Sequence, residues 1–380
     1  MGFSLRSSTS FQSAEEFVSS LLECAGVRIN GYRPCDIRVL DKSFYERVLA
    51  GGSLALGESY VEGAWECEDL SQFFYLVLRA RLDESVNPWA YVLQNFRARL
   101  VNLQSYRKAF EVGQAHYDLG NDLYRAMLDR RMVYTCAYWK DAETLDEAQE
   151  AKLDLVCRKL SLEPGMRVLD IGCGWGSFLK YAAERYGAIG TGITVSNEQA
   201  RLAKESCQGL DIRILVQDYR ELFGKFDRIV SLGMFEHVGE RNYRTYFEVA
   251  SERLKHDGLF LLHTIGGNKS EFTSDPWIEK HIFPNSMIPS ITQIGRAIEG
   301  LFVMEDWHSF GVDYDRTLLA WQANFKRNWQ ELSTRYDQAF YRKWTYYLLS
   351  CAGSFRARKN QLWQVVLSKN GLLGGYAGVR

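Results

Sequence analysis

Two side chains with acid–base chemistry stand next to each other in the segment LGMFEHVGERNY, residues 232–243, which begins apolar and then turns at a glycine. Glu236 and His237 directly follow the apolar residues. A carboxylate at a dry strand end costs free energy unless it is paired, protonated or bound to a ligand. Because neighbouring strand residues point to opposite faces, we expect the two side chains in different pockets, with His237 as a structural group near the glycine turn. The segment therefore predicts that Glu236 holds a partner or a ligand.

A glycine-rich loop in VLDIGCGWG is the second candidate for chemistry, with Asp170 followed by Gly172, Gly174 and Gly176. Glycines let the backbone turn tightly and approach a ligand, and the helix after the loop offers its N-terminal amides. A dinucleotide fingerprint requires a further glycine where Ser177 stands, so the match to NAD is poor. The pattern D-x-G-x-G-x-G before a helix instead resembles the first motif of class I S-adenosylmethionine-dependent methyltransferases.

The segment that follows, GITVSNEQ, departs from the commonest methyltransferase pattern. The second strand of those enzymes usually ends in an Asp or Glu that binds the ribose hydroxyls. Here Thr194 and Gln199 are available instead. The departure argues against a generic methyltransferase and favours a narrower group.

The elements that position these residues follow a regular pattern from Thr144 onward. Thr144 and Glu147 form a capping box, which predicts a helix running to about Leu160. Short apolar strands then alternate with amphipathic helices, a pattern typical of parallel βαβ units in a doubly wound α/β sheet. Ligands of such sheets bind beyond the carboxyl ends of the strands, where Glu236 and His263 are expected.

Composition narrows the class of protein. The 380 residues suggest two or three domains, and 46 basic against 47 acidic residues give no reason to expect a nucleic-acid partner. The 8 cysteines are scattered without metal-binding spacing, as in a reduced, cytoplasmic protein. The start lacks the apolar core of a signal peptide, and no run of about 18 apolar residues predicts a membrane span. Contact with a membrane surface remains open.

The N-terminal part contains a predicted amphipathic helix, NPWAYVLQNFRARLVNLQS. Its apolar residues share one helix face: Trp89, Val92, Leu93, Phe96, Leu100 and Leu103. Such a face can dock in a core or lie on a membrane. We predict an accessory domain at residues 1–103, a linker at 104–117 and a catalytic domain at 118–380.

Several longer segments carry a resemblance to one family: HYDLGNDLY, YTCAYWKDAETLDEAQEAKL, PGMRVLDIGCGWG, FDRIVSLGMFEHVG, LFLLHTIG and CAGSFRAR. They resemble the bacterial cyclopropane-fatty-acyl-phospholipid synthases and the related mycolic acid cyclopropane synthases. The segment GSLALGESYVEGAWECEDL is similar to the accessory domain of the phospholipid enzymes, which favours phospholipid as substrate. The resemblance implies a mostly parallel, seven-stranded, Rossmann-like methyltransferase sheet with a smaller N-terminal accessory domain.

The resemblance also implies a reaction, in which the cis double bond of an acyl chain attacks the sulfonium methyl of S-adenosylmethionine. The resulting carbocation loses a proton from the new methyl group, and a cyclopropane ring closes. Bound bicarbonate is the implied base. His263 and Tyr314 would donate hydrogen bonds to it, Cys136 and Ile265 would offer backbone amides, and Glu236 would accept its proton and orient it.

Cofactor contacts carried over from the family and the glycine motif are Tyr134, Thr135, Asp170, Gly172, Gly174, Gly176, Thr194, Gln199, Asp218 and Tyr219. Tyr134 and Thr135 match a pair that contacts the methionine part. Asp218 and Tyr219 match residues near the adenine, where a carboxylate can accept from the exocyclic amine and an aromatic ring can stack.

Two further segments have a less direct implied role. Cys351 matches a cysteine considered as a nucleophile, but a carbocation mechanism has no step for nucleophilic sulfur, so we expect a buried thiol that lines the site. His116 and Tyr117 resemble a lid over the cofactor, and an ordinary linker explains them equally well.

Three functions remain open at this level. The first is cyclopropanation of unsaturated phospholipid at the inner face of the cytoplasmic membrane, with peripheral binding to anionic bilayers that salt weakens. The second is methyl transfer to an alkene or amine without ring closure. The third is binding of S-adenosylmethionine and lipid without turnover. The family also suggests a homodimer.

Overall fold

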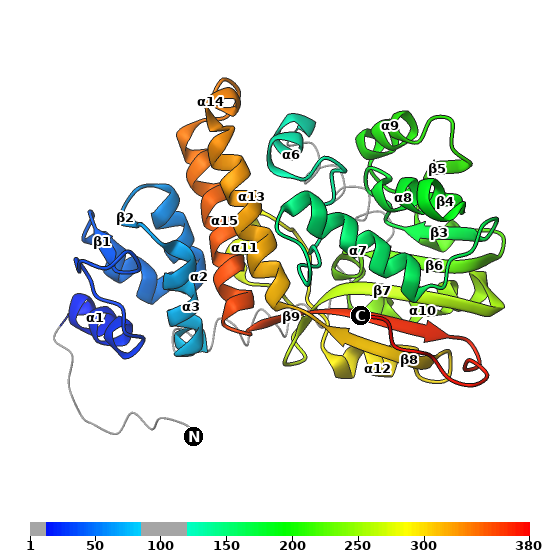
Figure 1. Ribbon diagram of the computed structural model, residues 1–380. Coiled ribbons are helices and arrows are strands. Elements are labelled where there is room, and N and C mark those ends of the chain that lie inside the picture. The colour runs from blue at the N-terminus through cyan, green and yellow to red at the C-terminus, as the bar shows by residue number, and fades with distance from the viewer. Residues whose placement is uncertain (1–12, 85–119) are drawn as a thin grey trace.

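The computed structural model describes residues 13–84 and 120–380 of the chain, and Figure 1 shows their arrangement. The predicted helix face at residues 89–103, both predicted domain boundaries, and His116 and Tyr117 lie outside these residues. The N-terminal elements are α1 (Ala14–Cys24), β1 (Ile37–Val39), α2 (Ser43–Val61), β2 (Trp65–Cys67), α3 (Leu70–Arg79) and the 3-10 turn η1 (Leu82–Glu84). Their two strands pair antiparallel.

A seven-stranded sheet forms the centre of the remaining chain. Its strands are β3 (Arg167–Ile171), β4 (Ile189–Thr194), β5 (Ile212–Val216), β6 (Phe226–Leu232), β7 (Leu254–Gly267), β8 (Val303–Ser309) and β9 (Asn360–Ser368). They are ordered β5-β4-β3-β6-β7-β9-β8. Neighbours from β5 to β7 are parallel, whereas β9 is antiparallel to both β7 and β8. The predicted seven-stranded, mostly parallel sheet is confirmed.

Helices cover both faces of this sheet. They are α6 (Asn121–Met127), α7 (Leu145–Lys159), α8 (Ser177–Tyr186), α9 (Asn197–Ser206), α10 (Glu240–Arg253), α11 (Pro276–His281), α12 (Ile291–Ile298), α13 (Val312–Arg327), α14 (Trp329–Leu332) and α15 (Gln338–Arg356). Successive residues of β3 point to opposite faces: Val168 packs with α7, α8 and α9, and Leu169 packs with α10 and α12. The sheet is therefore doubly wound, as predicted.

Two single-turn 3-10 helices, η2 (Tyr219–Glu221) and η3 (Phe235–His237), follow β5 and β6. The predicted capping box is present at the start of α7, where Thr144 accepts from the Glu147 amide and the Glu147 side chain accepts from the Thr144 amide. The prediction of a strand through Glu236 is wrong. Strand β6 ends at Leu232, Gly233 turns the chain with a positive φ of 69°, and Glu236 and His237 lie on η3.

The N-terminal elements share a hydrophobic core with the C-terminal helices. Figure 1 shows α2 and α3 beside α15, and one buried cluster runs continuously from Trp65 to Trp344. The ring of Trp277 on α11 lies 4.4 Å from that of Tyr346, and Lys280 donates to Glu58 of α2 at 2.6 Å. The N-terminal elements are therefore packed against the C-terminal helices over an apolar face.

None of the helices within residues 13–84 and 120–380 is both long enough and apolar enough to cross a bilayer.

The contact between α2 and α11 can be tested at Gly57, which is buried in α2. A Cβ atom at this position would overlap the Trp277 indole, so we expect Gly57→Ala to destabilise the chain by about 1–3 kcal/mol. Gly295→Ala is the matched control, because a Cβ atom there meets nothing within 4 Å and alanine favours the helix. Urea unfolding midpoints measure both effects. Equal midpoints for the two variants would contradict this packing.

Candidate cofactor pocket and anion site

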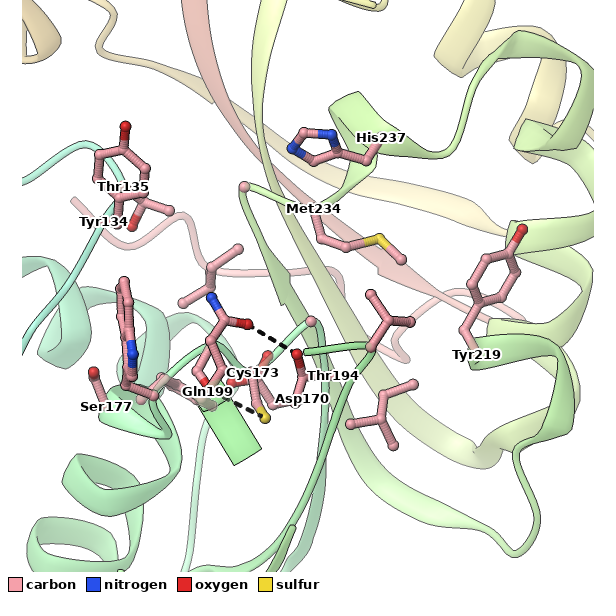
Figure 2. A pocket seen from close by; sticks show the side chains of 18 of the residues that line it. Tyr134, Thr135, Asp170, Cys173, Ser177, Thr194, Gln199, Tyr219, Met234 and His237 are labelled. Carbon is pink, nitrogen blue, oxygen red and sulfur yellow. Dashed lines mark hydrogen bonds between the residues drawn. The ribbon is translucent and has the colours of Figure 1, made fainter. Parts of the chain in front are cut away.

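A pocket opens at the carboxyl ends of β3, β4 and β6, where ligands of doubly wound sheets bind. All predicted cofactor residues except Gly176 line it. Figure 2 shows Tyr134 and Thr135 on one side and Tyr219 on the other. Met234 and His237 lie above, and Asp170, Cys173, Thr194 and Gln199 below. The predicted cofactor residues, which are distant in sequence, therefore surround one cavity.

The glycine loop after β3 depends on positive φ angles, 86° at Gly172 and 52° at Gly174. A Cβ atom at Gly172 would lie 2.7 Å from the Met234 side chain, so the loop and the turn after β6 approach each other closely. Gly176 was predicted to contact the cofactor, but it does not line the pocket. It is the N-cap of α8, and a Cβ atom there would face Cys207 Sγ at 3.1 Å rather than the cavity.

Two buried ionisable groups lie in the wall of the pocket. Asp170 is 2% exposed, its Oδ1 atom has no hydrogen-bond partner within the described residues, and burial raises its pKa to about 7. Lys152 is fully buried and donates to Thr135 Oγ1 at 2.8 Å. Burial lowers the pKa of Lys152 to about 8, although the Asp129 carboxylate opposes this shift. An orphaned carboxylate oxygen in such a wall fits a polar ligand.

Sequence reasoning missed Lys152, although a signal was present. Ala148, Lys152, Leu155 and Lys159 recur at helical spacing on the buried face of α7. Lysines are almost never fully buried without a specific partner. Two lysines within an apolar stripe therefore indicate polar surroundings beneath the helix.

Thr194 and Gln199 form a neutral pair at the end of β4. Thr194 Oγ1 donates to Gln199 Oε1 at 2.9 Å, shown as a dashed line in Figure 2, and accepts from the Ser196 amide at 3.2 Å. Ser196 in turn caps α9 by accepting from the Gln199 amide. Both pocket residues are thus fixed by local hydrogen bonds.

The segment that carries Tyr134 is fixed from several sides. The hydroxyl groups of Tyr134 and Tyr347 share a hydrogen bond of 2.8 Å, and the Tyr134 ring lies 5.1 Å from that of Trp321. Gln149 of α7 donates to the carbonyls of Val133 and Thr135 at 3.3 and 2.8 Å. Aromatic faces and a rigid backbone therefore meet at this side of the pocket.

The predicted adenine pair is also buried. Asp218 Oδ1 accepts from the Arg220 amide at 2.9 Å, and burial raises the pKa of this carboxyl group. The Arg220 guanidinium lies 4.9 Å from the centre of the Tyr219 ring, whose edge contacts Tyr246. An adenine stacked on Tyr219 would therefore use the face opposite Arg220 or displace the guanidinium.

His237 lines the pocket, on the same turn as the buried Glu236. Burial lowers the pKa of His237 to about 4, so the ring is neutral at physiological pH. Its Nδ1 atom is buried and has no partner within the described residues. The expectation that His237 is only a structural group near the glycine turn does not account for Nδ1, which lacks a partner in the described part of the chain and belongs to a side chain that lines the pocket.

None of the predicted catalytic residues lines the pocket, but Glu236 and Cys136 adjoin residues that do. Their chain neighbours form its wall, because Thr135 precedes Cys136, and Met234 and His237 flank Glu236. Glu236 Oε1 accepts from the Ile265 amide at 2.7 Å, whereas Oε2 is buried without a partner among the described residues. Burial raises the pKa of Glu236 to about 7. The Ile265 amide, expected to be free for an anion, is therefore bonded to Glu236.

His263 lies two residues before Ile265 on β7, so both side chains point to the same face. It is 1% exposed, and its Nε2 atom is buried with no partner in the described part of the chain. Burial holds the pKa of His263 well below its usual value, so the ring is neutral. Two unsatisfied polar atoms, Glu236 Oε2 and His263 Nε2, thus occur beside neighbouring strand ends.

The other three predicted residues belong to one hydrophobic cluster. Cys136 is fully buried, Tyr314 is 9% exposed with its ring 4.5 Å from Phe355, and Cys351 is half-buried on α15. Burial raises the pKa of the Cys351 thiol to about 12, so the reactive thiolate is scarce. A scarce thiolate agrees with the expectation that Cys351 is not a nucleophile, but Cys351 does not line the pocket. No cluster of three or more His, Cys, Asp or Glu side chains suited to a metal occurs in residues 13–84 and 120–380.

Comparison with known proteins places this architecture among lipid-modifying enzymes. The sequence profile described as Mycolic acid cyclopropane synthetase matches residues 104–365. The chain is 55% identical over 358 residues to the cyclopropane-fatty-acyl-phospholipid synthase of Escherichia coli K12, covering 93% of this chain and 94% of that protein. It is 37% identical over 277 residues to cyclopropane mycolic acid synthase 3 of Mycobacterium tuberculosis H37Rv, covering 67% of this chain and 96% of that protein.

A crystal structure of a mycolic acid cyclopropane synthase complexed with S-adenosylhomocysteine and CTAB superposes with a TM-score of 0.64. The two chains are 34% identical, and the match covers 68% of this chain and 98% of the other. Taken with the profile match, these similarities establish that the chain belongs to the mycolic acid cyclopropane synthetase family.

Proposed function

We propose that the protein transfers a methylene group from S-adenosylmethionine to the cis double bond of unsaturated phospholipid acyl chains, with bicarbonate as the base. The similarity to the Escherichia coli phospholipid enzyme supports this substrate, because it extends over 93% of the chain and includes the N-terminal elements. The observation that carries the mechanism is the pair of buried, unpartnered polar atoms, Glu236 Oε2 and His263 Nε2, near the carboxyl ends of β6 and β7.

The pocket residues fit the cofactor. The bound sulfonium would supply an electrophilic methyl group. Thr194 and Gln199 are suited to the ribose hydroxyls, and Asp218 to the adenine amine. Asp170 offers an unsatisfied oxygen to a donor, and Lys152 fixes Thr135 in the wall. Hydrogen bonds within the protein hold these side chains in place. Their remaining donors and acceptors would bind and orient the ligand.

Near these strand ends, the polar atoms fit a small anion with one proton. Glu236 Oε2 would accept the O–H of bicarbonate, and His263 Nε2 would donate to one of its oxygens. Tyr314 and the Cys136 amide are the further donors proposed from the family. Ile265 acts through Glu236, since its amide orients that carboxylate. Bicarbonate would then take the proton from the new methyl group and leave as carbonic acid.

Aromatic rings would stabilise the positive charge on the acyl chain. Tyr134, Trp321 and Tyr314 form a contiguous set, with centroid distances of 5.1 Å and 5.9 Å along it. A cation over a desolvated aromatic face gains up to about 2 kcal/mol. We further propose that the enzyme docks peripherally on the inner face of the cytoplasmic membrane to reach its substrate, and that it acts as a homodimer.

The reaction type can be tested with S-adenosylmethionine that carries a trideuteromethyl group and an unsaturated phospholipid dispersion. Ring closure removes one deuteron, so we expect the product to retain two, as measured by mass spectrometry of the released fatty acids. Methyl addition to an alkene or amine without ring closure would retain all three. Recovery of three deuterons, or no incorporation with any lipid, would contradict the proposal.

The role of Glu236 predicts an acid limb in the activity profile. The ionised carboxylate is needed as the acceptor, so kcat should fall as the pH drops through about 7, whereas His263 stays neutral in this range. Glu236→Gln should lower kcat by roughly 100-fold. Rates are measured at a constant bicarbonate concentration, with Glu240→Gln as the control, because Glu240 lies four residues further along the chain at the start of α10. A Glu236→Gln variant with normal kcat would exclude this role.

The neutral ribose pair predicts a defect in binding. Thr194→Val removes the hydroxyl that holds Gln199 and should weaken S-adenosylhomocysteine binding about tenfold, the effect of one to two hydrogen bonds. Thr191→Val is the matched control, because Thr191 lies on the same strand but outside the pocket. Isothermal titration calorimetry measures both. Equal affinities for the two variants would mean that the pair does not contact the ligand.

A further inference from the structure

A row of polar side chains crosses the buried sheet beside the anion site. His263 on β7 pairs directly with Gln364 on β9, and Gln364 pairs directly with His308 on β8. Side chains directly opposite each other in antiparallel strands point to the same face. The residues that surround Gln364 along β9, Val365 and Val366, are fully buried and apolar. The row is therefore a polar interruption in a hydrophobic sheet.

Gln364 is itself fully buried, and its amide contacts the site histidine. Its Nε2 atom lies 3.3 Å from His263 Nδ1, whereas its Oε1 atom has no partner among the described residues. A buried amide costs free energy unless its hydrogen bonds are made. Valine would pack at this position of the strand at a lower free-energy cost. The presence of an amide here therefore indicates a role at His263.

The direction of this hydrogen bond follows from the charges nearby. Lys159 of α7 is fully buried, and its Nζ atom lies 3.1 Å from His308 Nδ1, at the far end of the row. Asp306 lies 3.6 Å from Lys159 Nζ, but the charges that act on His263 are the positive ones of Lys152 and Lys159, and these favour an unpaired amide oxygen over an unpaired NH₂ group. Gln364 therefore directs its NH₂ group to His263, and Nδ1 of that ring must accept.

The consequence for His263 is specific because the ring carries a single proton. Burial, together with the positive charges of Lys152 and Lys159, keeps its pKa well below the usual value. In a neutral imidazole one nitrogen donates and the other accepts. If Nδ1 accepts from Gln364, the proton is on Nε2, the atom that faces the site without a partner.

We propose that Gln364 is a positioning residue that fixes His263 in the Nε2-protonated tautomer, so that the neutral ring presents an N–H donor to the anion site. The importance of this donor for catalysis rests on the proposed function. The tautomer itself does not, and it can be measured in the protein without substrate.

The test is ¹⁵N NMR of the full-length protein labelled at its 6 histidines, with the His263 signals assigned by their loss in His263→Asn. In the unmodified protein we expect Nδ1 of His263 to resonate as an unprotonated nitrogen and Nε2 as a protonated one. Gln364→Met removes the donor at similar volume, and a mixture of tautomers should result. Gln364→Glu replaces the donor by an acceptor and should move the proton to Nδ1. Gln361→Met is the control on the same strand, because Gln361 bonds to Arg358 instead.

Kinetics provide the second measurement. Gln364→Met should raise the KM for bicarbonate about tenfold while leaving the KM for S-adenosylmethionine unchanged, the effect of weakening one hydrogen bond to the anion. A proton on Nδ1 in the unmodified protein would overturn the inference. So would an unchanged tautomer in both Gln364 variants. If the tautomer follows Gln364 but activity never depends on bicarbonate, the proposed function fails and the assignment of Gln364 stands.

Discussion

The carboxylate of Glu236 is buried beside the end of the central sheet, held at 2.7 Å by the Ile265 amide and left with one oxygen unpaired. Removing a carboxylate from water costs several kcal/mol, and the hydrogen bonds that Glu236 accepts do not offset this, since its pKa is raised to about 7. The chain carries that cost at the point where β6 and β7 end. The turn at Gly233 is what brings this carboxylate to the end of the sheet, since it separates β6 from the 3-10 turn that carries Glu236. A ligand that satisfies the unpaired oxygen would also stabilise the fold.

Other buried polar groups lie beside the same sheet. The apolar face of α7 contains Lys152 and Lys159, and beneath it lie Thr135 and the row formed by His263 and its neighbours on β9 and β8. Each lysine has a polar partner in the described residues, at 2.8 and 3.1 Å. One helix thus carries both buried lysines, and their positive charges contribute to the lowered pKa of His263.

Much of the fold and of the candidate site could be predicted from the sequence, and there are physical reasons why the remaining features could not. The capping box at Thr144 and the glycine loop after β3 are local signals, because neighbouring residues alone determine their conformation. The turn at Gly233 was missed because FEH continues an apolar run that reads as a strand. Gln364 was missed because its role depends on the strand that pairs with it, and antiparallel β9 enters the sheet from far along the chain. Residues whose partners are distant in sequence leave no local pattern.

Because α15 packs continuously against the N-terminal helices, the chain cannot be cut between them without exposing apolar surface. Trp277 and Tyr346 contact each other at this junction, and both are at most 3% exposed. Cutting the chain after the accessory elements would expose a contiguous aromatic face to water, and such faces promote aggregation. The N-terminal part thus keeps an apolar face of the long helix out of water, whatever else it contributes.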